Sequence, residues 1–142
     1  MVAALLLASL LAAGDAQAQA GQRLTQEQAI ELAGQGKHQA ALEAFQQLAA
    51  ENPRNAEPRL WIGRMHAKMG HHDQAESVFR SVMLENPENL EAIIGLSDAL
   101  VGLRRNDEAL VVLSKAASAQ PQNPELSAAV RRARGNRFPW FW

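Results

Sequence analysis

Cysteine is absent from this chain of 142 residues. The sequence therefore offers no disulfide, thiolate metal site or lipidated cysteine. Charges nearly cancel, with a formal net charge of −1, so composition gives no electrostatic argument for binding nucleic acid. Long hydrophobic runs are also missing, because the longest apolar or small run, residues 2–13, is too short to span a bilayer as a helix. The composition otherwise predicts one soluble domain.

That short apolar run lies near the start of the sequence and predicts an export signal over residues 1–20. Two small-x-small sites for a signal peptidase follow it, at residues 16–18 and 18–20. We therefore expect a mature chain that begins near Gln19 or Gly21 and is exported, either to the periplasm or as a secreted protein. No lysine or arginine precedes the run, whereas a usual signal has a basic start. The alternatives are a true start upstream, or an uncleaved segment that acts as a weak anchor.

Similar stretches recur at equal spacing, with ENPRNAE at 51–57, ENPENLE at 85–91 and a looser copy, AQPQNPE, from Ala119. A fixed period indicates structural repeats. Three rows of equal length, 22–55, 56–89 and 90–123, align residues of similar size in the same columns. These columns hold small residues (Ala29, Gly63, Ser97 and Ala41, Ala75, Ala109), bulky ones (Phe45, Phe79, Leu113), turn residues (Gly36, Gly70, Arg104) and prolines (Pro53, Pro87, Pro121).

These columns predict two packed helices in each row. Small residues let the helices approach closely, the bulky residue fills the gap between them, and glycine allows the turn. Proline ends the second helix because it lacks an N–H and clashes with the preceding turn. We expect Ala41, Ala75 and Ala109 to be buried at helix crossings. Arg104 breaks the glycine pattern in the third row.

The sequence resembles a tetratricopeptide repeat protein, most clearly in AEPRLWIGRMHAKMGHHDQAESVFRSVMLENPEN at residues 56–89. The resemblance implies an all-α, right-handed solenoid of three helix pairs, followed by a capping helix and a tail over residues 124–142. Two rows depart from the family at column four, where Thr25 and Arg59 replace a large apolar residue. Gln28 replaces an aliphatic residue in the first row, which suggests a loosely packed first helix.

The resemblance also implies a concave face that binds another protein as an extended peptide or a helix, with no catalytic activity and no cofactor. Leu60, Trp61 and Ile94 would hold an apolar side chain, while Arg64 and Lys68 would meet acidic flanks. Trp61 has the alternative role of a core residue that replaces the missing aromatic at column four. The positions that the family directs inward are Arg23, Gln26, Ile30, Glu57, Leu60, Trp61, Arg64, Lys68, Glu91, Ile94, Asp98 and Val101.

The carboxylate clamp that some members of the family carry in this groove is absent from the sequence. Members that serve heat-shock chaperones hold a C-terminal carboxylate with lysine, asparagine and arginine at five inward positions. Here those positions are occupied by Gln26, Ile30, Trp61, Glu91 and Gly95.

Histidines at 66, 71 and 72 are a conceivable metal site, since imidazole is a common ligand. His66 occupies a packing column, and the other two lie in a predicted turn where polar residues are expected. We therefore expect no metal site. No nucleophile, base and orienting group recur at helical spacing, so no catalytic residues are predicted.

The end of the sequence, RRARGNRFPWFW, combines four arginines with four aromatic residues, Phe138, Trp140, Phe141 and Trp142. Formal charge is −3 over residues 22–123 and +3 over 124–142. The helix after Pro124 is expected to cap the solenoid with a polar face that includes Arg131 and Arg134. The aromatic tail has three open roles: a hydrophobic lid over the last repeat, a contact with a partner, or weak membrane contact.

Two classes of function follow. The first is an exported scaffold or adaptor for an envelope assembly or secretion complex. The second is a membrane-peripheral protein, anchored by an uncleaved N-terminus or by the aromatic tail, whose repeats recruit partners.

Overall fold

A computed structural model describes residues 24–135 and contains seven α-helices and no strand in that range. This confirms the expected all-α fold of six repeat helices and one further helix. The export signal expected over residues 1–20, Arg23 and the tail residues Phe138, Trp140, Phe141 and Trp142 lie outside the described residues. The helices are α2 (Gln26–Gly34), α3 (His38–Glu51), α4 (Ala56–Lys68), α5 (His72–Glu85), α6 (Leu90–Gly102), α7 (Asn106–Ala119) and α8 (Pro124–Arg134).

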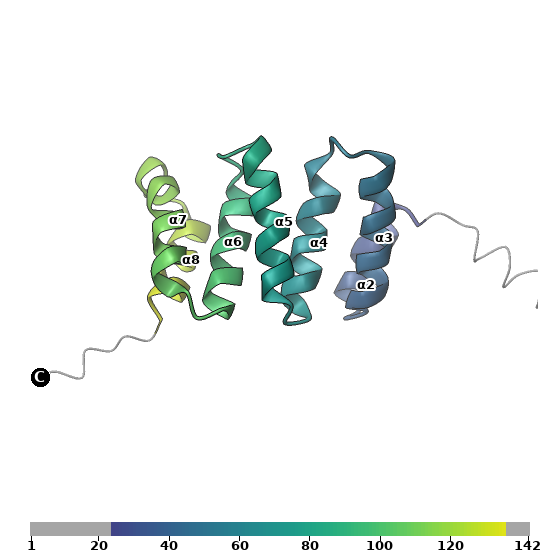
Figure 1. Ribbon diagram of the computed structural model, residues 1–142, viewed down its shortest axis with the longest axis horizontal. Helices are drawn as coiled ribbons and strands as arrows, with labels where there is room; N and C mark the ends of the chain where they lie inside the picture. The colour runs from purple at the N-terminus through teal and green to yellow at the C-terminus, as the bar shows by residue number, and fades with distance from the viewer. Residues whose placement is uncertain (1–23, 136–142) are drawn as a thin grey trace, which may run out of the picture.

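The helices form antiparallel pairs that stack side by side in chain order, from α2 and α3 at one end to α7 and α8 at the other (Figure 1). Each helix packs on the next, and α4 also contacts α6, as α6 contacts α8. Because α4, α6 and α8, the first helices of successive pairs, touch past the single second helix between them, they form the inner side of the stack. Over residues 24–135, none of the helices has the length and hydropathy that a membrane span requires.

The columns of the aligned rows match the packing of the helix pairs. Ala41, Ala75 and Ala109 are each 0% exposed, as expected for residues at helix crossings. The bulky column is equally buried, with Phe45, Phe79 and Leu113 at 0–1% exposure. The alternation of small and bulky residues therefore sets how closely neighbouring helices approach.

Turns repeat with the same period as the helices. Gly36, Gly70 and Arg104 all have positive φ, between 64° and 79°, at the turn from the first to the second helix of each pair. Arginine incurs a steric cost in this left-handed region that glycine avoids. The prolines fall in the turns after α3, α5 and α7, where the second helices were expected to end.

A further periodic feature caps the first helices. Asn55, Asn89 and Asn123, which share one column of the aligned rows, are the N-caps of α4, α6 and α8, and each side chain accepts a hydrogen bond from a backbone N–H of the first turn. These bonds satisfy donors that the start of a helix leaves unpaired.

Thr25 and Arg59, the two residues that depart from the repeat pattern at column four, each have a local physical reason. Thr25 is the N-cap of α2 and forms a capping box with Gln28, so α2 begins at the fifth column of its row and not at the first. Arg59 forms a two-pronged ion pair with Glu85 of α5, with N–O distances of 2.7 and 2.6 Å. Polar contacts thus replace apolar packing at column four.

Buried apolar residues form two clusters that meet at α4. The larger cluster extends from Leu60 of α4 through α5, α6 and α7 to Ala133 of α8. The smaller one joins α2 and α3 to Met65 of α4, with Trp61 and Ile62 packed against it. The first helix pair is therefore attached to the rest of the fold through one side of α4.

Candidate functional site

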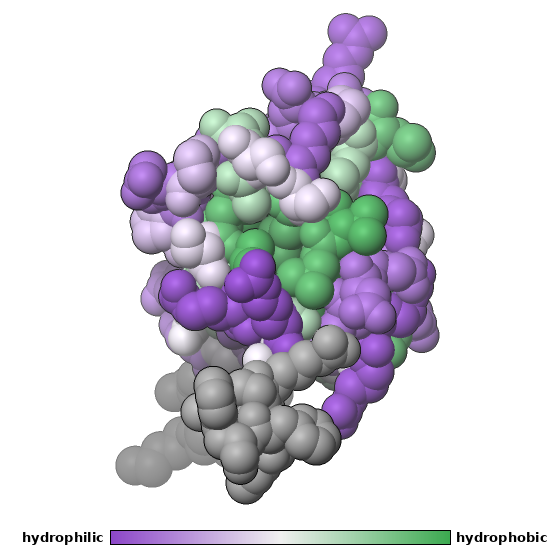
Figure 2. Space-filling view, turned by 90° about the vertical axis from the view of Figure 1, so that its left-hand side faces the viewer, coloured by the Kyte–Doolittle hydropathy of each residue, from purple (hydrophilic) through white to green (hydrophobic). Residues whose placement is uncertain are grey.

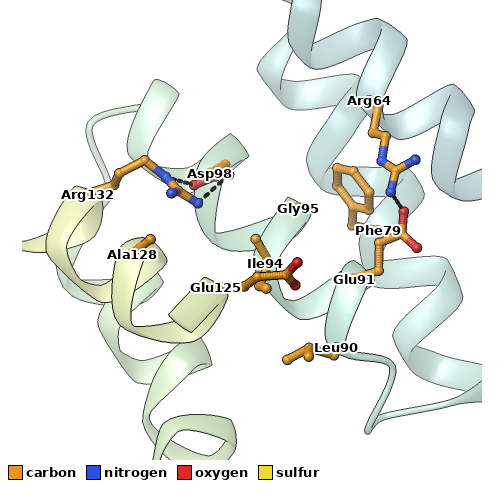
Figure 3. Close-up of a pocket in the computed structure, with 10 residues that line it drawn as sticks. All are labelled: Arg64, Phe79, Leu90, Glu91, Ile94, Gly95, Asp98, Glu125, Ala128 and Arg132. Atoms are coloured by element: carbon orange, nitrogen blue, oxygen red, sulfur yellow. Dashed lines mark hydrogen bonds and ion pairs between the residues drawn. The ribbon is translucent and has the colours of Figure 1, made fainter. Parts of the chain in front are cut away.

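A groove of about 550 Å³ lies between α4, α6 and α8 on the inner side of the stack. Ile94, Gly95 and Ala128 provide uncharged surface, and the ring of Phe79 reaches it from α5 (Figure 3). Charged side chains border this surface on both sides. The complete lining is Arg64, Phe79, Leu90, Glu91, Ile94, Gly95, Asp98, Glu125, Ala128 and Arg132.

The groove is open because glycine occupies position 95. In the preceding repeat the same column holds Trp61, whose ring stacks on Phe45 with centroids 5.1 Å apart and planes 5° apart. At Gly95 there is no side chain, and the space is taken in part by the Phe79 ring: a Cβ added there would lie 2.4 Å from its Cζ atom. Gly63 makes a similar close approach on α4, at 2.7 Å. The tryptophan-to-glycine change thus leaves apolar surface uncovered between α6 and its neighbours.

Ion pairs between successive first helices form the two borders. Asp98 of α6 accepts two hydrogen bonds from Arg132 of α8, at 2.8 and 2.9 Å, and Arg64 of α4 pairs with Glu91 of α6. The Asp98 and Arg132 side chains are 41% and 47% exposed, so water and salt screen their attraction. Such exposed pairs add little stability and can exchange for a ligand group at small cost.

The charge left over in the groove is negative. Among its lining residues are three carboxylates and two guanidinium groups, and the two guanidinium groups are already paired. Within residues 24–135 the carboxylate of Glu125, in the first turn of α8, makes no hydrogen bond or ion pair. Glu125 is therefore positioned to meet a cation beside the apolar surface.

The structure brings together only part of the predicted set. Arg64, Ile94 and Asp98 line the groove. Leu60 does not, because its side chain is 4% exposed and lies inside the larger core cluster. This burial corrects the expectation that Leu60 offers an apolar anchor to a ligand.

Trp61 lies beside the groove and not in its lining. Its half-buried indole stacks on the core residue Phe45, and the guanidinium carbon of Arg64 lies 4.5 Å from the centroid of the indole ring. The cation–π contact packs the Arg64 guanidinium against Trp61. Its partial burial there removes water from the charged group, which lowers the pKa of Arg64. The alternative role of Trp61, packing on the first repeat, thus has direct contacts in its support.

The remaining predicted residues are outside the lining of this groove. Gln26 donates a hydrogen bond from Nε2 to Oε1 of Glu57 at 2.9 Å. Ile30 is 36% exposed on α2, and Lys68 is exposed at the end of α4.

The groove residues that the sequence did not predict come mainly from α8, the first helix of an incomplete fourth repeat. Glu125 and Arg132 stand one repeat after Glu91 and Asp98, so continuing the inward columns into a fourth row would have found both. The sequence pattern identifies Gly95 only as a position where the chaperone-type clamp is absent.

The histidines do not converge on a metal site. The rings of His66 and His71 are 6.0 Å apart and tilted, and burial followed by the nearby His71 lowers the pKa of His66. In the part of the chain that the structure describes, no three metal-ligating side chains form a group.

Comparison with known proteins identifies the repeats. The tetratricopeptide repeat family pattern matches residues 32–85 and 66–133. A tetratricopeptide repeat protein of Thermus thermophilus has 26% sequence identity and a TM-score of 0.66, over 72% of this chain and 58% of that one. The chain thus spans less than two thirds of that relative. No curated protein matches the sequence.

Two more distant structures share the fold. The second tetratricopeptide repeat domain of human RPAP3, solved with the HSP70 peptide SGPTIEEVD, has 17% identity and a TM-score of 0.69, over 76% of this chain and 90% of that one. The tetratricopeptide repeat domain of Arabidopsis OM64 has 22% identity and a TM-score of 0.68, over 78% of this chain and 91% of that one. The repeat is generally a non-catalytic fold for protein–protein interaction. The periodic sequence, the stacked helix pairs and the family match together show that the chain belongs to the tetratricopeptide repeat family.

Proposed function

We propose that this protein holds a segment of another protein in the groove between α4, α6 and α8, as an exported scaffold or adaptor for an envelope assembly or secretion complex. The observation that carries the proposal is the groove itself: uncharged surface at Ile94 and Ala128, left open by Gly95, with exchangeable ion pairs on both sides. An apolar side chain of a partner gains free energy by covering that surface.

The RPAP3 complex supports a peptide as the form of the ligand, since that domain holds an HSP70 peptide. A different peptide is required here, because the positions of the chaperone-type clamp hold other residues. Glu125 favours a basic residue next to the apolar anchor. The earlier expectation of acidic flanks at Arg64 requires a ligand carboxylate to displace Glu91.

Export rests on the sequence of residues 1–20, with its apolar run and two small-x-small sites. Cell fractionation with sequencing of the mature N-terminus is expected to give a soluble chain that begins near Gly21. An intact N-terminus in the membrane fraction would refute cleaved export and support the membrane-peripheral alternative.

Binding is tested with extended peptides that carry one leucine flanked by lysine, by glutamate or by neutral residues, measured by fluorescence anisotropy. We expect the lysine-flanked peptide to bind most tightly, and Glu125→Gln to remove its advantage. Ile94→Asp should weaken binding about tenfold or more, because it places a charge on the apolar anchor site.

The matched control is Val111→Asp, which changes an aliphatic residue that is 72% exposed on α7, away from the groove. It should leave the affinity unchanged. Equal affinity for the parent and Ile94→Asp would show that binding occurs elsewhere. If only the glutamate-flanked peptide binds, and Glu91→Gln strengthens it, the acidic ligand is correct and the role of Glu125 is not.

A further inference from the structure

The C-terminal end of the stack has a second groove, of about 290 Å³, on the other side of α8. In the three preceding pairs, the first helix is covered by a second helix that follows it in the chain. Within residues 24–135, α8 has no such partner. Figure 2 shows this end of the molecule, where an apolar area is surrounded by hydrophilic side chains. The groove is lined by Ala117, Gln120, Pro121, Leu126, Ser127, Val130, Arg131 and Arg134.

Two arginines give this end groove a cationic rim. Unlike Arg132, which pairs with Asp98, Arg131 and Arg134 make no ion pair within the described residues. The floor beside them is apolar, with Val130 and Ala117. Aromatic side chains suit such a surface, because a ring packs on the apolar floor and its face attracts a guanidinium group.

The start of the following segment is fixed close to the end groove. Asn106 of α7 donates a hydrogen bond from Nδ2 to the carbonyl oxygen of Ala133 at 2.8 Å, which holds the end of α8. Gly135 then ends the helix with φ +65°. Residues with positive φ also stand at the turns after α2, α4 and α6, where the chain reverses to cover the helix before it.

The segment that follows Gly135 has the composition and length to cover the end groove. Four of its seven residues, 136–142, are aromatic. Seven extended residues span about 23 Å, whereas α8 rises about 12 Å from Leu126 to Arg134. A segment that reverses after Gly135 therefore reaches the whole groove.

We propose that residues 138–142 bind in the end groove, in place of the second helix that a fourth repeat would have. The aromatic rings cover Val130 and Ala117 and contact the guanidinium groups of Arg131 and Arg134. The C-terminal segment is thus a built-in cap of the solenoid, and the surface it covers is withheld from other occupants.

Disulfide trapping tests this arrangement directly, because the chain has no cysteine of its own. Pro139 is four residues beyond Gly135, about 13 Å of extended chain, and Ser127 is eight residues before it, about 12 Å of helix. In the full chain, Ser127→Cys with Pro139→Cys should therefore form an intramolecular disulfide rapidly while leaving all four aromatic residues in place.

The matched control is Ala128→Cys with Pro139→Cys. Ala128 is adjacent along α8 but lines the inner groove, so a bound segment should leave it far less reactive than Ser127. An unbound segment would react with both at similar rates, since both lie at similar chain separation. Replacing Phe138, Trp140, Phe141 and Trp142 with serine should remove the preference for Ser127→Cys.

Equal oxidation rates for the two pairs would overturn the proposal. Disulfide-linked dimers on a non-reducing gel would overturn it in favour of a second copy as occupant. Loss of the preference on addition of phosphatidylcholine–phosphatidylglycerol vesicles would show that the aromatic residues favour a membrane surface over the groove.

Discussion

Replacing Gly95 by alanine should destabilise the protein, although alanine is the better helix former. A Cβ at this position would lie 2.4 Å from Cζ and 2.5 Å from Cε1 of Phe79. The ring cannot simply withdraw toward α4, because Gly63 is already in close contact with the same ring atoms. Relief therefore requires a shift of the Phe79 side chain or of the α6 backbone.

The magnitude follows from two opposing effects. Overpacking of a core typically destabilises a protein by about 1 to 3 kcal/mol. Replacing glycine by alanine within a helix stabilises it by about 1 kcal/mol. We expect a net loss of about 1 kcal/mol for Gly95→Ala. Gly34→Ala is the matched control, since nothing lies within 4 Å of its added Cβ and no positive φ is involved. It should gain about 0.5 to 1 kcal/mol.

Urea and thermal unfolding followed by circular dichroism measure the difference. The melting midpoints of the two variants should move in opposite directions, by about 4 °C per kcal/mol for a fold of this size. A double-mutant cycle with Phe79→Leu, which removes the clashing ring atoms, should give a coupling energy of about 1 kcal/mol. If Gly95→Ala stabilises as much as Gly34→Ala, or if the two changes are additive, the close packing of Phe79 between glycines is refuted.

Three further predictions concern the turns, the ion pairs and the helix crossings. Arg104→Gly should stabilise the fold by about 0.5 to 1 kcal/mol in urea unfolding, as removal of left-handed strain exceeds the entropy cost of glycine; no gain would contradict the strain. The hydrogen bond from Arg59 lowers the pKa of Glu85 in the folded protein. The stability that this ion pair adds is therefore complete above the ordinary glutamate pKa, and it is lost as pH falls through the lowered pKa of the folded state. Glu85→Gln should reduce this acid dependence in unfolding measured across pH, and an unchanged profile would exclude the pair as its source. Ala75→Leu should lower stability by about 1 to 3 kcal/mol, whereas an unchanged melting midpoint would count against the assigned crossing.

The sequence predicted the fold well because the same packing problem recurs in every repeat. One buried alanine such as Ala75 indicates little, but three at equal spacing predict a repeated helix crossing. The turn at Arg104 could not be predicted from its residue type, since arginine rarely has positive φ. Only its position in the column of Gly36 and Gly70 indicates the turn.

The groove was less predictable because it depends on side-chain contacts between repeats. Leu60 stands at an inward column of the family, but its side chain packs within the core cluster that includes Phe79. The partner of Arg64 was not determined by helical spacing, since Glu57 and Glu91 both lie on neighbouring inward positions. Burial and pairing of this kind follow from the relative placement of helices, which the period alone does not give.

The division of the core at α4 has a consequence for local unfolding. Because Leu60 and Met65 belong to different clusters, α2 and α3 can separate from α4 with the loss of the smaller cluster alone. The larger cluster supports α6 and α8, and thus most of the inner groove, during such an opening. Amide hydrogens of α3 should then exchange with solvent at a lower free energy than those of α6. Apart from Arg64, which lies on Trp61 at the edge of the smaller cluster, the lining of the proposed ligand groove should therefore keep its support while the first helix pair opens.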